Sequence, residues 1–204
     1  MGSELTIYSI NGSCSDAVAA LCAHLGLRAE MRQRKDFDEA LTAINPERTV
    51  PTIVTDSGLV LTETSAILNH LARYHAVELL GRGAAERARN EEMCSFVATG
   101  IYSAFLLRFR PDRYADSDEA RAAIREKSET AIGKALDSLE ARVGDNAFAV
   151  GESLTTSDFF LLVMMKWAER VDPALLQQRP KLLAYWQRLR NMPFFAKAFE
   201  AAAA

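Results

Sequence analysis

The stretch from Val50 to Ile67 constrains the fold most, because it combines a proline, two short strands and a helix start. Thr52–Thr55 and Leu59–Leu61 are β-branched or apolar, and Asp56-Ser57-Gly58 between them supplies the glycine that a tight hairpin turn needs. Val50-Pro51 precedes the first strand, where a residue without an N–H is tolerated. We expect this X-Pro bond to be cis, with the backbone groups of Val50 turned outward.

Four polar residues, Thr62-Glu63-Thr64-Ser65, then precede an apolar helical run that begins at Ile67. Polar side chains in this position cap a helix, and the free N–H groups at a helix start bind anions. One short segment therefore offers an exposed backbone edge and a nearby site for a carboxylate. A peptide-like ligand with a free α-carboxylate would use both.

The residues before this stretch predict a small α/β unit. Leu5–Tyr8 is a short strand, and the helix after it ends at Gly26. Ala29–Arg34 is predicted as a second strand, with polar residues that suit an edge, and Phe37–Ile44 as a short helix or irregular segment. The hairpin and a helix at Ser65–Tyr74 complete the unit, which belongs to the α/β class.

Helix-period patterns dominate the rest of the chain. Ala76–Ala85 contains two glycines and is predicted as a linker, and a long helix through Met93 and Phe105 stops at Pro111. Phe159–Met165 is apolar on all sides, which marks a central buried helix. Further helices are predicted at Ile124–Val143, Pro180–Asn191 and Pro193–Ala201. The predicted organisation is an α/β domain at residues 1–76, a linker at 77–85 and an all-helical domain at 86–204.

Composition excludes several classes of function. The 204-residue chain has a net charge of −3 and no basic block, which argues against nucleic acid as a partner. No apolar run approaches the ~20 residues of a membrane span. Three widely spaced cysteines indicate a reducing compartment and hence a cytoplasmic protein. His24, His70 and His75 show no metal-ligand spacing, so we expect no metal site.

Of the three cysteines, Cys14 lies in the sequence position that best suits a reactive thiol. It follows a strand and a Gly-containing loop, at the start of a helix that begins at about Cys14 or Ser15. The helix dipole favours a thiolate there, whereas the negative charge of Asp16 opposes it. A single cysteine would exchange thiols through a mixed disulfide with a small thiol. Without further context, capping or packing explains a cysteine here better. Cys22 and Cys94 lie on apolar helix faces and are predicted as core.

The Val50–Ile67 segment resembles the glutathione-binding core of glutathione S-transferases. Val50-Pro51 matches the family's Val-Pro, and Glu63-Thr64 matches its Glu/Gln-Ser pair, with threonine keeping the hydroxyl. Tyr8–Ser15, Tyr-Ser-Ile-Asn-Gly-Ser-Cys-Ser, is similar to the Tyr-x-x-Pro-Gly-Ala-Cys-Ser loop of the bacterial beta class. Gly151–Asp158 resembles the family's Gly-x-x-x-Thr-x-Ala-Asp signature, physically a Thr-x-x-Asp capping box with a folding role.

The resemblance implies a thioredoxin-like N-terminal domain, an all-α C-terminal domain and glutathione as co-substrate. Val50 and the cis Pro51 would pair with the cysteinyl part of glutathione, and Glu63 and Thr64 would hold its γ-glutamyl end. Cys14 would lie at the sulfur, with Ser13 and Ser15 as reserve hydroxyls. Lys35 is assigned to the glycyl end of glutathione, where Arg34 or Arg48 could also serve.

The helix around residue 100 departs from the beta class. Ala98-Thr99 matches the class, but Ser95, Gly100, Tyr102 and Ser103 replace the Asn, Glu, His and Lys that contact glutathione there. Tyr102 is the evident substitute donor toward the sulfur, although a tyrosine on a helix face explains the residue equally well. The second substrate would lie beside Ile10-Asn11. The aromatic and sulfur-containing residues assigned to that pocket, or alternatively to the core, are Phe105, Phe109, Met164 and Trp167.

These residues support two hypotheses. The first is a transferase that conjugates glutathione to a hydrophobic electrophile or exchanges thiols with a disulfide through Cys14. The alternative is a binding or assembly module without catalysis, since one fold supports many functions. The resemblance also implies a homodimer formed by the helices that start near Ser65 and Glu86.

Overall fold

The computed structural model describes residues 5–33, 38–193 and 195, and a mixed four-stranded sheet is the centre of its N-terminal part. The strand order is β2-β1-β3-β4, with β1 parallel to β2 and antiparallel to β3, and β3 antiparallel to β4. Ile7 of β1 lies opposite Met31 of β2 and Ile53 of β3. The edge position predicted for the second strand is confirmed. The strands are β1 (Leu5–Ser9), β2 (Ala29–Gln33), β3 (Thr52–Thr55) and β4 (Val60–Thr62).

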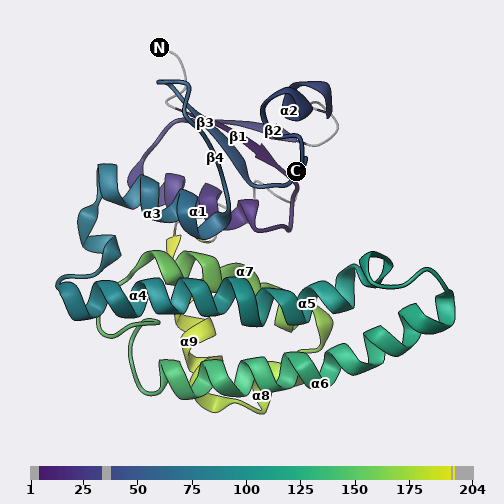
Figure 1. Cartoon of the computed structure of the whole chain (residues 1–204). Helices are drawn as coiled ribbons and strands as arrows, with labels where there is room; N and C mark the ends of the chain where they lie inside the picture. Colours follow the sequence, from purple (N-terminus) through teal and green to yellow (C-terminus); the bar gives the residue numbers. More distant parts are fainter. Residues whose placement is uncertain (1–4, 34–37, 194, 196–204) are drawn as a thin grey trace.

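Helices cover both faces of this sheet. The helices α1 (Ser15–Leu25) and α3 (Thr64–His75) lie between the sheet and the helical domain (Figure 1). They bury one sheet face, including Ile7 and Ile53, in the main hydrophobic core. The short α2 (Asp38–Ile44) covers the other face, where Tyr8 and Leu41 form a separate small cluster. The expected α/β class and thioredoxin-like arrangement are confirmed by this topology.

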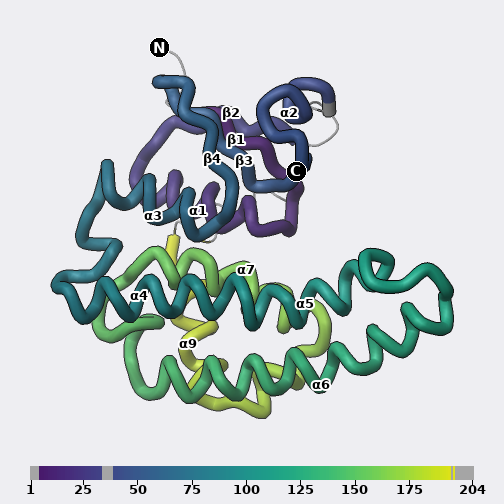
Figure 2. Tube along the Cα trace, viewed as in Figure 1, coloured from purple at the N-terminus to yellow at the C-terminus, as the bar shows by residue number. Residues whose placement is uncertain are grey.

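The C-terminal part is a bundle of helices that lies below α1 and α3 (Figure 2). The predicted linker contains a short 3₁₀ helix, η2 (Val77–Leu80), before the first long helix. The predicted long helix through Met93 and Phe105 is interrupted, because a π-helical turn separates its two halves. The elements are α4 (Ala84–Phe96), η3 (Val97–Ile101), α5 (Tyr102–Phe109), η4 (Pro111–Arg113), α6 (Asp118–Val143), α7 (Thr156–Val171), α8 (Ala174–Gln177) and α9 (Pro180–Arg190).

The helix α7 is the core of the molecule, as its apolar sequence predicts. Every residue from Thr156 to Met165 is buried, and α7 contacts α1 and α3 of the upper domain. Its start is the predicted capping box: Asp158 accepts from Thr155 N at 2.8 Å, and Thr155 Oγ1 donates to the same carboxylate at 3.0 Å. Asp158 also accepts from Ala149 N and from the Tyr185 hydroxyl, each at 2.8 Å. The structural role assigned to Asp158 therefore has a geometric basis.

Some predictions concern residues outside the described ranges. Arg34 and Lys35 lie there, and so does most of the helix predicted at Pro193–Ala201. Within the described part of the chain, no helix has the length and apolar character that crossing a bilayer requires.

Candidate active site

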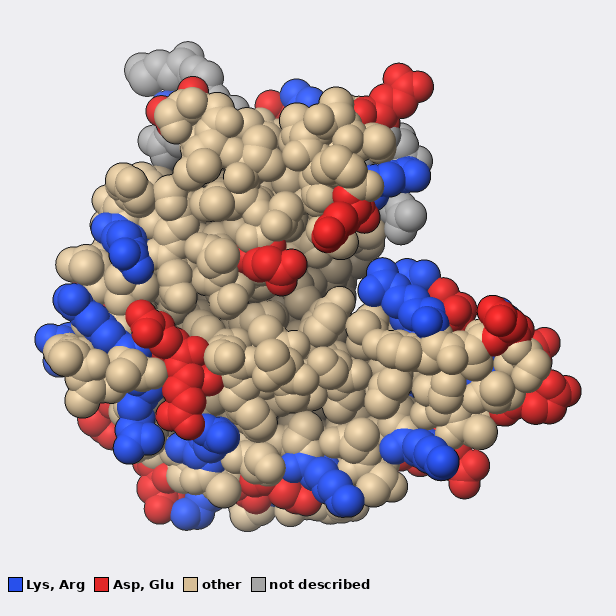
Figure 3. Space-filling view, viewed as in Figure 1, with Lys and Arg blue, Asp and Glu red and all other residues tan. Residues whose placement is uncertain are grey.

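A pocket of about 200 Å³ lies between the α/β domain and the helical domain. In the space-filling view the two domains are separated by a hollow with acidic side chains on its upper side and basic ones on the lower (Figure 3). Six residues that the sequence assigned to the site line the pocket together. They are Cys14, Val50, Pro51, Glu63, Thr64 and Tyr102.

The β3 side of the pocket is set by the loop before the strand. The Val50-Pro51 bond is cis, as expected. The Asn45 side chain donates to the Thr49 carbonyl at 3.2 Å and to Thr52 Oγ1 at 2.9 Å, and Thr52 Oγ1 donates to the same carbonyl at 2.8 Å. This network fixes the loop that presents Val50 to the pocket.

The start of α3 forms the opposite wall. Glu63 is the residue before the helix. Its backbone φ of 67° lies in the left-handed region that residues other than glycine rarely adopt. Its side chain does not cap α3, so the first N–H groups of the helix receive no hydrogen bond from the Glu63 carboxylate. Thr64 is buried beside them, and Ser65 also lines the pocket. Strained backbone of this kind concentrates at ligand sites.

Cys14 lies at the N-cap of α1, and the residue is only 6% exposed. Burial raises the pKa of its thiol to about 12; a hydrogen bond with Thr64 lowers it, and the charges of Asp16 and Glu63 raise it further. The thiolate that the helix start was expected to favour is therefore disfavoured in this structure. The helix-start effect is small, and loss of hydration outweighs it.

Tyr102 is the first residue of α5 and comes directly after the π turn. The pKa of its hydroxyl is raised, first by burial and then by the nearby Cys14. Gly100 of the turn lies against Phe96, because an added Cβ would meet that ring at 3.2 Å. The extra residue in a π turn rotates the helix beyond it, and such turns are frequent at functional sites. Both candidate catalytic groups are thus protonated hydrogen-bond donors.

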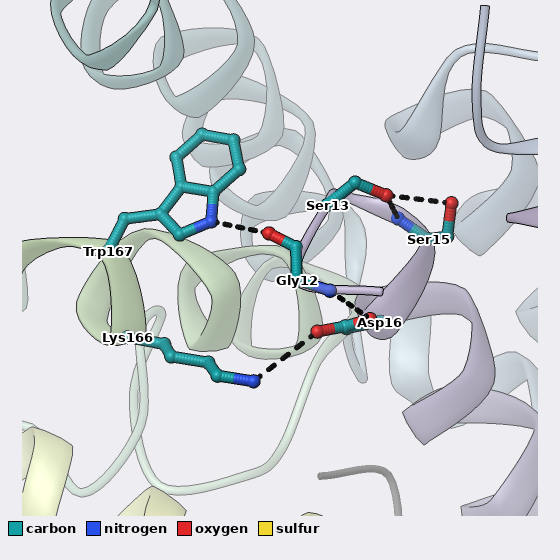
Figure 4. Close-up of polar contacts among 6 residues, drawn as sticks. All are labelled: Gly12, Ser13, Ser15, Asp16, Lys166 and Trp167. Carbon is teal, nitrogen blue, oxygen red and sulfur yellow. Dashed lines mark hydrogen bonds and ion pairs between the residues drawn. The ribbon is translucent and has the colours of Figure 1, made fainter. Parts of the chain in front are cut away.

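The loop between β1 and α1 is tied to α7 (Figure 4). Trp167 Nε1 donates to the Gly12 carbonyl at 2.8 Å, and Lys166 Nζ lies 3.5 Å from the Asp16 carboxylate. Ser13 Oγ donates to Ser15 Oγ at 3.0 Å and accepts from Ser15 N at 3.2 Å. The two serines shape the turn and are not among the residues that line the pocket, so their role as reserve hydroxyls stays a prediction.

Two family models match the chain, one for each domain. The N-terminal domain model of glutathione S-transferases matches residues 12–73, and the C-terminal domain model of the same family matches residues 97–193. This chain belongs to the glutathione S-transferase family. The two matched ranges cover well over half of the chain. Five of the six predicted pocket residues lie in the first range, and Tyr102 lies in the second.

Individual glutathione S-transferases agree with this assignment. GstA of Escherichia coli O157:H7 is 27% identical over 203 residues, which cover 93% of this chain and 94% of GstA. A sphingomonad glutathione S-transferase, solved in complex with glutathione, is 27% identical with a TM-score of 0.81, over 97% of this chain and 98% of that one. The beta-class enzyme of Sphingomonas chungbukensis is 27% identical with a TM-score of 0.82 over the same shares. The beta-class resemblance of the Cys14 loop fits these neighbours.

The described part of the structure does not show which basic residue would bind the glycyl end of glutathione. Lys35 and Arg34 lie outside them. Arg48 has a φ of 55° and lines a separate shallow depression with Glu39 and Thr42. The assignment of Lys35 therefore stays a prediction.

The residues assigned to a second substrate are mostly core. Phe105 and Met164 are completely buried, and Trp167 packs edge-on against Phe105 and Phe109. Sequence reasoning did not assign four of the pocket residues to a part of glutathione. They are Thr49, Ser65, Ala98 and Phe160. Thr49 and Ser65 adjoin predicted site residues, whereas Phe160 was assigned to a buried helix and gave no separate signal.

The other two cysteines are buried, as the sequence predicted. None of the three cysteines is in a disulfide. Burial raises the pKa of Cys94 to about 12, so its thiol is protonated. Among the residues that the structure describes, no group of histidine, cysteine and acidic side chains could hold a metal ion.

Proposed function

We propose that this glutathione S-transferase binds glutathione in the pocket between Val50-Pro51 and the start of α3, and transfers its sulfur to a second substrate. The observation that carries the proposal is the convergence of Cys14, Tyr102, Val50 and Glu63-Thr64 on one pocket of about 200 Å³. The sphingomonad relative that was solved with glutathione supports it. Glutathione is then the co-substrate, whichever second substrate is used.

The charges of the pocket suit the γ-glutamyl end of glutathione, which carries a carboxylate and an ammonium group. The carboxylate would lie on the Thr64 hydroxyl and the first N–H groups of α3, where the helix dipole favours an anion. The ammonium would lie on the Glu63 carboxylate, as a charge-assisted hydrogen bond. Glu63 lines the pocket with a strained φ. Its carboxylate does not cap α3.

The protonation of Cys14 and Tyr102 favours conjugation as the chemistry. Both pKa values are raised by burial, so both groups can donate a hydrogen bond to a glutathione thiolate and stabilise it. That thiolate would attack an electrophilic carbon of a hydrophobic substrate and form a C–S bond. The leaving group would depart with its electron pair, and the thiol proton would go to water. Removal of hydrophobic electrophiles in this way would be a detoxification reaction.

Thiol exchange is the second candidate, and the place of Cys14 in the pocket favours it. The Cys14 thiolate would attack a disulfide sulfur, form a mixed disulfide and release one thiolate. A glutathione thiolate would then attack the mixed disulfide and release Cys14. This route requires Cys14 to lose its proton first, which its burial opposes.

A pair of substitutions separates the two reactions. Cys14→Ser keeps a hydrogen-bond donor but no thiol, and Cys14→Ala removes both. If Cys14 acts as a donor, Cys14→Ser retains conjugation of an aryl halide within a few-fold and Cys14→Ala loses about tenfold or more. If Cys14 is the nucleophile of thiol exchange, both variants lose exchange with glutathione disulfide and both retain conjugation.

The alternative to the transferase proposal is a binding or assembly module that has no catalytic activity. The replacements at Ser95, Gly100 and Ser103, together with the protonated Cys14, are the observations in its favour. Retention on immobilised glutathione without turnover of aryl halides or disulfides would support it and overturn the transferase proposal.

We also propose that the protein is a cytoplasmic homodimer. Tyr74 at the end of α3 and Val77 in η2 are 73% and 50% exposed, and two large apolar side chains exposed close together indicate a covered surface. Three reduced thiols fit a reducing compartment. The α3 and α4 faces of two copies would cover Tyr74 and Val77.

A further inference from the structure

The turn that carries Cys14 is held by α7 at two adjacent positions. Trp167 Nε1 donates to the Gly12 carbonyl at 2.8 Å, and Lys166 Nζ lies 3.5 Å from Asp16 Oδ2. Asp16 Oδ1 in turn accepts from Gly12 N at 3.3 Å. Gly12 is therefore fixed through both its carbonyl and its N–H, directly by Trp167 and through Asp16 by Lys166.

The side chains of consecutive helix residues point about 100° apart. They therefore seldom contact the same neighbouring segment of the chain. Here both side chains extend from α7 toward the turn, Trp167 to Gly12 and Lys166 to Asp16 (Figure 4). Cys14 lies inside the segment that the two contacts enclose, between Gly12 and Asp16. A movement of this turn would therefore move Cys14 as well.

The two contacts differ in character. Asp16 is buried, and Lys166 is the cation that offsets its charge while its own side chain is 33% exposed. Trp167 is 9% exposed, and its ring also lies 6.0 Å from the ring of Tyr102. One side chain thus contacts the turn before Cys14 and the helix that carries Tyr102.

We propose that Lys166 and Trp167 are positioning residues that fasten the Gly12–Asp16 turn to α7 and thereby keep the Cys14 thiol buried in the pocket wall. Neither side chain lines the pocket, so each acts through the turn. Loosening either contact lets the turn move away from α7 and exposes Cys14. This positioning role goes beyond the glutathione chemistry proposed above and does not depend on it.

The test measures alkylation of each cysteine by N-ethylmaleimide, followed by peptide mass spectrometry. Cys22 and Cys94 are buried in the same chain and report any general loosening. Trp167→Phe keeps an aromatic ring and removes the N–H donor, and Lys166→Met keeps the apolar stem without the charge. We expect labelling of Cys14 to rise by about 2- to 10-fold in Trp167→Phe, the effect of one hydrogen bond, and by at least as much in Lys166→Met.

Two controls separate positioning from general destabilisation. Lys166→Arg keeps the cation and should label Cys14 at close to the parental rate. Lys134→Met removes an exposed lysine of α6 and should change nothing. A Cys14 rate within about twofold of the parent in Trp167→Phe would overturn the proposal. A parallel rise at all three cysteines would overturn it as well, because it would mean a structural role only. The labelling assay contains no glutathione. Its result therefore tests the positioning role even if the protein does not bind glutathione.

Discussion

Cys14 lies where two opposing effects meet. The start of α1 favours a thiolate, and typical helix-terminus effects are about 0.3–1 kcal/mol at exposed positions. Burial and the neighbouring charges of Asp16 and Glu63 act the other way, and the pKa of the thiol is about 12. At pH 8 the thiol is therefore almost entirely protonated. The residue is therefore better suited to donate a proton than to attack.

This protonation gives a pH prediction. Alkylation of Cys14 in the unmodified protein should rise about tenfold per pH unit from pH 7 to 10 without a plateau, because the pKa lies above this range. Folding keeps the proton on the thiol, so the stability linked to that proton is present below the ordinary value of 9.0 and is lost as pH rises toward about 12. Peptide-resolved labelling with iodoacetamide checks the profile, with Cys94 as an internal comparison. A plateau near pH 7 would show an activated thiol instead.

Glu63 offers a second test at the scale of one residue. Glu63→Ala and Glu63→Gly both remove the carboxylate, so both should weaken glutathione binding by about 1.5–3 kcal/mol, roughly tenfold or more. Only glycine accepts the φ of 67° without strain, so Glu63→Gly should melt above Glu63→Ala. Calorimetric titration and thermal melts measure the two effects separately.

The control for this pair is Glu152→Ala, which removes an exposed carboxylate in the helical domain. Unchanged affinity in both Glu63 variants would remove this residue from the site. A loss of affinity in Glu63→Ala alone would attribute the effect to the backbone and not to the carboxylate.

The sequence could indicate most site residues because their context is local. Val50-Pro51 and Glu63-Thr64 flank one hairpin, and Cys14 follows one strand. It could not indicate that Cys14 is buried, because the residues around the thiol come from the start of α3 and from the turn held by α7. The contacts of Trp167 and Lys166 with that turn span 155 and 150 residues and leave no local pattern.

At the scale of elements, the start of α7 is the clearest case of sequence determining structure. Asp158→Ala would remove the cap and leave Ala149 N and the Tyr185 hydroxyl without their acceptor. We expect a loss of about 2 kcal/mol or more in the free energy of unfolding, which lowers Tm by roughly 4–8 °C. Thermal melts of Asp158→Ala and of the surface control Asp116→Ala measure it. A stable but inactive Asp158→Ala would reveal a functional role for this carboxylate.

The π turn Val97–Ile101 shows the limit of helical periodicity. Apolar spacing through Met93 and Phe105 fits one continuous helix, since a single extra residue barely changes the pattern. The turn nevertheless decides which face carries Tyr102. Gly100 is the local sign of it, because the Phe96 ring leaves little room for a side chain there.

For the whole molecule, the proposed homodimer predicts a solution mass of twice the 22.5 kDa of one chain. Tyr74→Glu would place a charge in the covered face and should shift the protein toward the monomer. Tyr114→Glu is the matched control, because Tyr114 is also exposed but lies beyond η4, away from α3. Light scattering coupled to size-exclusion chromatography gives both masses. A monomeric parent at micromolar concentration would contradict the dimer.

Both candidate reactions require glutathione to occupy the pocket between Val50-Pro51 and the start of α3. A crystal structure of the protein grown with saturating glutathione tests this requirement most directly. We expect the cysteinyl backbone to pair with Val50, the γ-glutamyl carboxylate to lie on Thr64 and the first N–H groups of α3, and the sulfur to lie next to Cys14 and Tyr102. Glutathione bound elsewhere, or an empty pocket at concentrations that saturate the sphingomonad relative, would contradict it.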